Sequence, residues 1–134
     1  MKIQHVATEH VNQVWPKVAD YIEAALAYQD DYTLEHAKVY LATGAWMLIV
    51  ASGDDGQLHG AAALQFFNRP NDRVAFVIAM GGRLITGPET FAQFKNLLQA
   101  FGATYIEGAS RDSAARLWQR FGLEEKYRIV GAKL

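Results

Sequence analysis

The segment from Arg73 to Met80 constrains the fold most, because it is apolar on both faces of an extended chain. One face would carry bulky side chains and the other smaller ones: Val74, Phe76, Ile78 and Met80 against Ala75, Val77 and Ala79. A strand that is buried on both sides lies inside a sheet with layers packed above and below it. The segment therefore predicts an α/β domain with a covered central strand, and its smaller face leaves room for a helix or a ligand.

The other predicted elements surround this strand in a mixed order. Residues 2–6 alternate like a short strand, and an apolar stripe from Val11 to Leu26 predicts a helix. Further strands are expected at 46–51, 58–67, 104–108 and 127–134, and further helices at 33–41, 86–101 and 114–121. With 134 residues, of which 51% are hydrophobic, the chain suits one core, so residues 1–134 are expected to form a single domain. We predict a mixed, mostly antiparallel sheet of six or seven strands, flanked by about four helices.

Helix ends are marked by capping residues. Thr8 and Thr33 are placed to cap the first two helices, and Gly44 suits a left-handed exit from the second. Thr86 and Glu89 have the spacing of a capping box for the third helix. These signals predict where the helices begin and end, independently of the apolar stripes.

Composition excludes several classes of function. Thirteen basic and fourteen acidic residues leave no cationic excess for binding nucleic acid or anionic lipid. The chain has no cysteine, which rules out disulfides and thiolate chemistry and fits a reducing cytoplasm. The four histidines stand at no recognised ligand spacing, so we expect no metal site. No signal core and no stretch of about 20 apolar residues is present, so neither export nor membrane insertion is expected.

A motif near the end of the chain resembles a known family. Residues 114–123 read AARLWQRFGL, and the family motif is Asn-x-x-Ala-x-x-Leu/Phe-Tyr-x-x-x-Gly-Phe. Four residues stand at matching positions: Ala114, Leu117, Gly122 and Leu123. The motif and the order of elements, over nearly the whole chain, are similar to the Gcn5-related N-acetyltransferases (GNATs). The resemblance implies a GNAT-like acyl-CoA N-acyltransferase fold.

The resemblance also implies a cofactor site for acetyl-coenzyme A between the fourth and fifth strands, along residues 75–80 and 105–108. Backbone N–H groups near Val77, Ile78 and Ala79 would polarise the thioester. In the family, the diphosphate binds an Arg/Gln-x-x-Gly-x-Gly/Ala loop at a helix N-terminus. This chain has GRLITG at residues 82–87, in which only Gly87 stands in register and Arg83 is the cation that could compensate. The alternative is an ordinary turn followed by a helix cap.

Departures from the family pattern also affect the expected chemistry. Pro88 lacks an N–H and Glu89 adds a negative charge, so both weaken diphosphate binding. Trp118 would lie beside the cofactor, where the family usually keeps a tyrosine that protonates the departing thiolate, and an indole N–H is no usable acid. Glu107 is the only carboxylate predicted beside the cleft. It is the candidate catalytic base, with an ordinary strand-surface carboxylate as the alternative.

We therefore predict a degenerate GNAT-like domain that is catalytically impaired and serves in protein interaction. The chain looks like short accessory proteins of tailed bacteriophages, some of them virion-associated. That resemblance implies a phage or host protein as partner, and the cytoplasm of the bacterial host or the virion as location. Two alternatives stay open: an active acetyl-CoA-dependent N-acetyltransferase acting on a small amine or a lysine, and a coenzyme A-binding module without transfer. The strand at 127–134 could pair between chains or be covered.

Overall fold

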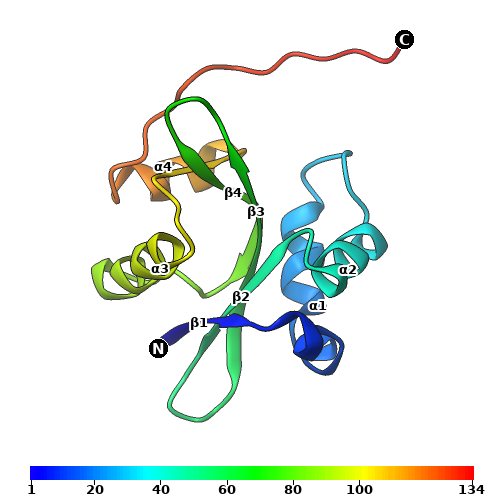
Figure 1. Cartoon of the computed structure of the whole chain (residues 1–134), viewed down its shortest axis with the longest axis vertical. Helices are drawn as coiled ribbons and strands as arrows, with labels where there is room; N and C mark the ends of the chain where they lie inside the picture. Colours follow the sequence, from blue (N-terminus) through cyan, green and yellow to red (C-terminus); the bar gives the residue numbers. More distant parts are fainter.

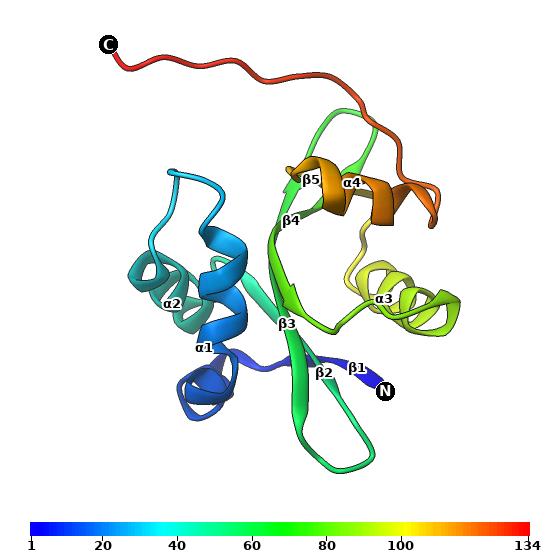
Figure 2. The same cartoon turned by 180° about the vertical axis from the view of Figure 1, so that it is seen from behind.

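A computed structural model, which describes residues 1–134, contains one five-stranded sheet with helices on both faces (Figures 1 and 2). The strands lie in the order β1-β2-β3-β4-β5. Their bounds are β1 (Lys2–Val6), β2 (Met47–Ser52), β3 (Leu58–Asn68), β4 (Arg73–Gly82) and β5 (Tyr105–Gly108). Neighbouring strands are antiparallel except for β4 and β5, which are parallel. The predicted fold class, a mixed and mostly antiparallel sheet, is confirmed.

Four α-helices divide between the two faces of the sheet (Figure 1). On one face lie α1 (Val11–Leu26) and α2 (Leu34–Thr43), and on the other lie α3 (Pro88–Ala100) and α4 (Asp112–Gln119). A short 3-10 turn, η1 (Thr8–His10), precedes α1. Each layer of helices closes its own apolar cluster against the sheet, so β4 is covered on both faces as the sequence predicts.

Local capping signals decide the ends of α2 but not the start of α1. The Thr33 hydroxyl accepts a hydrogen bond from the His36 N–H, and the His36 ring accepts one from the Thr33 N–H. Gly44 ends the helix with a φ of 85°, in the left-handed region. The expectation that Thr8 caps α1 is wrong, because Thr8 belongs to the preceding 3-10 turn and no side chain caps α1.

A bulge in β4 changes which residues share a face. Leu64 of β3 pairs with Val77, but the preceding Ala63 pairs with Ala79, so Ile78 is the extra residue. Val77 therefore packs in the cluster beneath α3, whereas Ala79 packs in the cluster beneath α1 and α2. The predicted continuous small face does not exist, because a bulge shifts the alternation by one residue.

The predicted last strand at 127–134 is not formed, which is why the sheet has five strands instead of six or seven. No residue after Leu123 makes a backbone hydrogen bond, and the chain leaves the body as an extended segment (Figure 1). Its apolar side chains are exposed to solvent: Ile129 is 84% exposed and Val130 is 92% exposed. An apolar, β-branched segment favours extended backbone, but a strand forms only where a partner edge is paired with it.

Gly81 provides a test of how closely β4 approaches α1. A Cβ atom at this position would lie 2.0 Å from the carbonyl oxygen of Tyr21, and a helix backbone cannot yield locally. We expect Gly81→Ala to lower the free energy of unfolding by about 3 kcal/mol, measured by urea denaturation. Gly87→Ala is the matched control. It has an extended backbone with φ 176° and no atom within 4 Å of a Cβ, so it should change stability by less than about 0.5 kcal/mol. Equal stability of the two variants would contradict the packing described.

Candidate functional site

The first feature of the site is that β4 extends beyond the end of β5. Their parallel ladder extends from Val74 opposite Tyr105 to Val77 opposite Gly108. Beyond that pair β4 continues to Gly82 with no strand beside it on this edge, and the bulge at Ile78 follows directly. Backbone groups on this stretch are therefore available to hydrogen-bond an extended ligand. This is the stretch that the sequence resemblance assigns to acetyl-coenzyme A.

The side chain of Thr90 forms hydrogen bonds with the backbone of the loop between β4 and α3. The Thr90 Oγ1 accepts hydrogen bonds from the N–H groups of Thr86 (2.8 Å) and Gly87 (3.2 Å). The same hydroxyl donates to the carbonyl oxygen of Gly87 (3.1 Å), which uses its full bonding capacity. Thr90 is the only buried polar residue of the chain, with 5% of its surface exposed.

This arrangement corrects the predicted capping box of Thr86 and Glu89. The helix begins one residue later than that box requires, with Gly87 at the N-cap and Pro88 in the first turn. Because Gly87 has no side chain, only the half of the box that Thr90 supplies can form. The sequence carried a signal for this: a threonine stands three residues after a glycine that precedes proline.

Apart from Arg83, the rest of the loop offers little to an anion. Leu84 and Ile85 are buried in the cluster beneath α3, so they anchor the loop from within. Arg83 is exposed and its guanidinium has no hydrogen bond or ion pair, while its backbone N–H donates to His59 O at 2.7 Å. Glu89, in the first turn of α3, places a negative charge where a diphosphate would approach.

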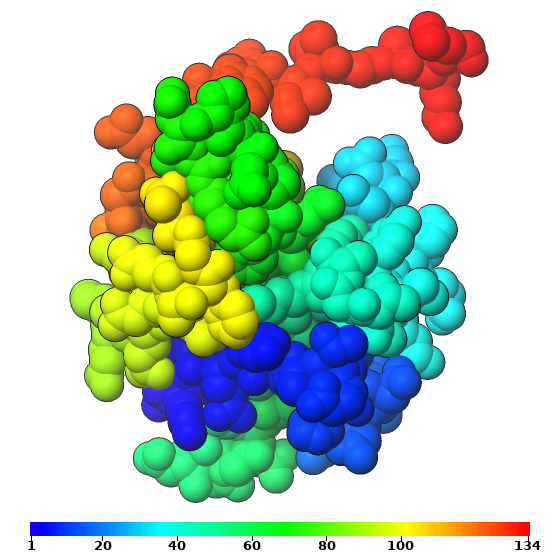
Figure 3. All heavy atoms as spheres, in the orientation of Figure 1, coloured from blue at the N-terminus to red at the C-terminus, as the bar shows by residue number.

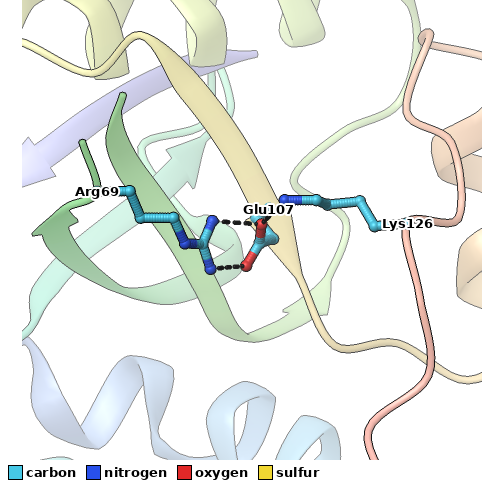
Figure 4. A network of polar contacts seen from close by, with 3 residues as sticks. All are labelled: Arg69, Glu107 and Lys126. Atoms are coloured by element: carbon cyan, nitrogen blue, oxygen red, sulfur yellow. Dashed lines mark hydrogen bonds and ion pairs between the residues drawn. The ribbon is translucent and has the colours of Figure 1, made fainter. Parts of the chain in front are cut away.

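Glu107 lies at the centre of an ion triad (Figure 4). Two nitrogens of Arg69 each donate to one carboxylate oxygen at 2.7 Å, and the Lys126 Nζ donates to Oε2 at 3.0 Å. The triad joins the β3–β4 turn, β5 and the segment after α4. The sequence predicted neither partner, because they lie 38 and 19 residues away from Glu107 in no recognisable pattern.

The triad changes what Glu107 can do chemically. Hydrogen bonds from Arg69, and then from Lys126, lower the pKa of Glu107 from 4.5 to about 2, although burial acts in the opposite direction. A carboxylate with so low a pKa is a weak proton acceptor at neutral pH. Both of its oxygens are also occupied by charged donors. The geometry therefore favours the alternative of a structural carboxylate, and the catalytic role of Glu107 stays a prediction.

Trp118 packs against α3. Its ring lies 6.5 Å from that of Phe91, edge to face, and Phe91 in turn stacks on Phe121 at 4.8 Å. Arg111, at the start of α4, lies 3.9 Å from the centre of the Tyr28 ring and so ties this end of α4 to the end of α1. These aromatic contacts hold α4 in place over the sheet.

A cavity of about 1020 Å³ lies along the outer edge of β5. Its walls are β5, α4 and the segment that follows α4, and they include Val77, Glu107 and Trp118. Of the other predicted site residues, Ile78, Ala79, Arg83 and Gly87 do not line it. The structure therefore divides the predicted site into a loop by α3, the free stretch of β4, and a cavity beside β5.

Two kinds of feature are missing from the structure. No group of three or more His, Asp or Glu side chains lies together as metal ligands would. None of the helices combines the length and the apolar character needed to cross a lipid bilayer.

Comparison with known proteins identifies the fold of the chain. No protein-family model and no curated protein matches the sequence. Among solved structures, the chain is similar to a "probable acetyltransferase", with 16% identity, a TM-score of 0.71 and coverage of 100% of this chain and 97% of that one. It is similar to a ribosomal-protein-alanine N-acetyltransferase from Brucella melitensis biovar Abortus 2308 (15% identity, TM-score 0.69, 100% of both chains). It is also similar to an aminoglycoside acetyltransferase from an uncultured soil metagenomic sample (12% identity, TM-score 0.69, 99% and 94%). The chain has the acyltransferase fold of the GNATs, as the sequence resemblance predicted.

The ion triad predicts how stability depends on pH. Because Glu107 holds its proton more weakly in the folded than in the unfolded state, the triad stabilises the fold above pH 4.5, and this stability is lost as the pH falls towards about 2. Between these pH values the wild type should lose about 1–2 kcal/mol more unfolding free energy than Glu107→Gln. The loss is no larger because Arg69 and Lys126 are each about one-third exposed, and water screens their interaction with Glu107. The measurement is urea denaturation at a series of pH values.

Glu125→Gln is the control for this comparison. Its pair with Arg128 is long, at 3.6 Å, and exposed, so the variant should follow the wild-type curve. Parallel curves for the wild type and Glu107→Gln would show that the triad does not contribute as described.

Proposed function

We propose that this chain is a degenerate GNAT-like domain in which acetyl transfer is impaired, and that it acts by binding another protein. The observation that carries the proposal is the position of the Thr90 hydroxyl. It accepts from the backbone N–H groups of Thr86 and Gly87, at the helix N-terminus where the resemblance places the cofactor diphosphate. Two of the backbone donors on this loop are therefore already used within the chain.

Displacing Thr90 would be costly. A diphosphate that took over the two N–H groups would leave a buried hydroxyl with fewer partners, at about 1–3 kcal/mol for an unsatisfied group. That cost corresponds to a loss of roughly 10- to 100-fold in affinity. Pro88 supplies no donor, and Glu89 repels an anion. Arg83 is the one cation on this loop, and a single exposed side chain compensates only partly.

The chemical groups support the same proposal. Trp118 stands where the family usually has a proton-donating tyrosine, and its indole N–H does not release a proton near neutral pH. Glu107 is held by two cations and has a pKa of about 2. Neither residue is suited to the proton transfers of amine acetylation. The scaffold then presents its surface to a partner protein. A phage or host protein as this partner stays a prediction from the sequence, and so does the location in the bacterial cytoplasm or the virion.

One observation favours the alternative of an active N-acetyltransferase. The bulge at Ile78 falls where β5 ends, so its backbone N–H lies on the stretch that would face the thioester of acetyl-coenzyme A. Polarisation by a backbone N–H requires no particular side chain. In this alternative, the acceptor is a small amine or a lysine, and Glu107 or water takes its proton. Binding of coenzyme A without transfer is the intermediate case.

Titration with acetyl-coenzyme A separates the proposal from both alternatives. We expect no detectable heat by calorimetry at millimolar ligand, because Thr90 uses two donors of the loop, Pro88 supplies none and Glu89 repels an anion. Saturable binding in the micromolar range, about −8 kcal/mol, would contradict the proposal. A thiol-release assay with small amines and a lysine peptide would then distinguish an enzyme from a coenzyme A-binding module.

A further inference from the structure

The outer edge of β5 is open. β5 has four residues and pairs with β4 on one side only. Outside the helices and the sheet ladders, no backbone hydrogen bond reaches residues 105–110. The cavity of about 1020 Å³ runs along this edge, between β5, α4 and the segment after α4. A strand edge with free N–H and C=O groups beside a cavity with a partly apolar lining is a template for one more strand.

The segment at 127–134, called the tail from here on, has the character of a strand without a partner. It is extended, contains no proline and makes no backbone hydrogen bond. Ile129, Val130 and Leu134 are almost fully exposed, and Tyr127 is more than half exposed. In the space-filling view the tail projects beyond the body of the molecule (Figure 3). Apolar side chains gathered on one exposed segment mark a surface that is covered by something else.

The tail is directed away from the β5 edge of its own chain. At its root, the Lys126 Nζ is bound to Glu107 and lies 4.8 Å from the centre of the Tyr105 ring. Beyond this point the tail runs clear of β5, towards the side on which α1 and α2 lie (Figures 1 and 2). Residues 127–130 line part of the cavity, and residues 131–134 do not line it. Its own tail thus forms no backbone hydrogen bond with β5 and leaves the N–H and C=O groups of that edge unpaired.

A second copy of the chain fits the open edge. Eight residues in strand geometry span roughly 26 Å, about twice the length of the four-residue β5, so one tail can cover the whole edge. In two copies related by a two-fold axis, the tail of each copy would pair with β5 of the other. The unpaired backbone groups of both β5 edges would then be hydrogen-bonded through the same contacts. The apolar tail residues would then enter a cavity lined in part by Phe91, Trp118 and Phe121.

We propose that the tail of each chain adds as a sixth strand to the β5 edge of a second copy, in a reciprocal exchange. The partner tail closes the cavity beside Trp118 and Glu107, so this part of the candidate site is complete only in the dimer. The proposal goes beyond the proposed function and does not rest on it, because an active or an inactive domain could exchange the same strand.

The first test is the mass in solution, by size-exclusion chromatography with light scattering at roughly 100 μM chain, which populates a dimer of micromolar Kd. We expect the mass of two 14.9 kDa chains. The double variant Ile129→Asp/Val130→Asp should be monomeric, because two carboxylates would lose water against a lining that includes Phe91, Trp118 and Phe121. Its circular dichroism should still show the helices of a folded domain, since both residues are exposed in the single chain. Val39→Asp, at a 55% exposed position on α2, is the matched control and should stay dimeric.

The second test locates the tail. The chain has no cysteine, so Ser110→Cys and Ala132→Cys introduce single thiols at exposed positions beside β5 and in the tail. After the two variants are refolded together, a flexible bismaleimide should join position 110 of one chain to position 132 of another, identified by mass spectrometry. A monomeric wild type would overturn the proposal. So would a chain carrying both substitutions that links these positions only within itself, because the tail would then cover its own edge.

Discussion

The structure depends on the burial of β4, which is hydrogen-bonded on both sides and covered on both faces. Its antiparallel ladder to β3 runs along its whole length, whereas its parallel ladder to β5 covers only Val74 to Val77. The bulge at Ile78 turns Ala79 towards α1, and Gly81 admits the helix backbone at close range. One strand therefore fixes the positions of both helical layers. It also creates the unpaired stretch on which the cofactor of a GNAT would lie.

Around this strand, polar groups are satisfied by other groups of the chain. No buried side-chain nitrogen or oxygen lacks a hydrogen-bond partner. Thr90 closes the loop by α3, and the ion triad occupies both oxygens of Glu107. A site prepared for an anion or a proton transfer usually keeps such groups free or strains them. The fold of an acyltransferase is thus combined with polar interactions within the chain, and unpaired backbone remains on β4 beyond Val77 and along the outer edge of β5.

Sequence reasoning predicted those features that short-range patterns encode. The apolar stripe of α1, the cap at Thr33 and the two-sided apolarity of β4 each depend on residues close together in the chain. The bulge at Ile78 was missed because alternation alone cannot reveal an extra residue; the pairing with β3 creates it. The partners of Glu107 were missed because tertiary contacts bring them together. The tail was predicted as a strand from its composition, but whether such a segment pairs depends on an edge that the sequence does not display.

The central claim is that the Thr90 hydroxyl occupies two backbone donors at the start of α3, and hydrogen exchange of the Thr86 and Gly87 amides tests it most directly. Measured by NMR in the free protein, both amides should be protected in the wild type. Thr90→Ser, which keeps the hydroxyl, should preserve the protection, and Thr90→Val, which replaces it by a methyl group of similar size, should remove it. If the two wild-type amides exchange at the rate of unprotected backbone, the loop is open to an anion, and the account of an impaired site is wrong.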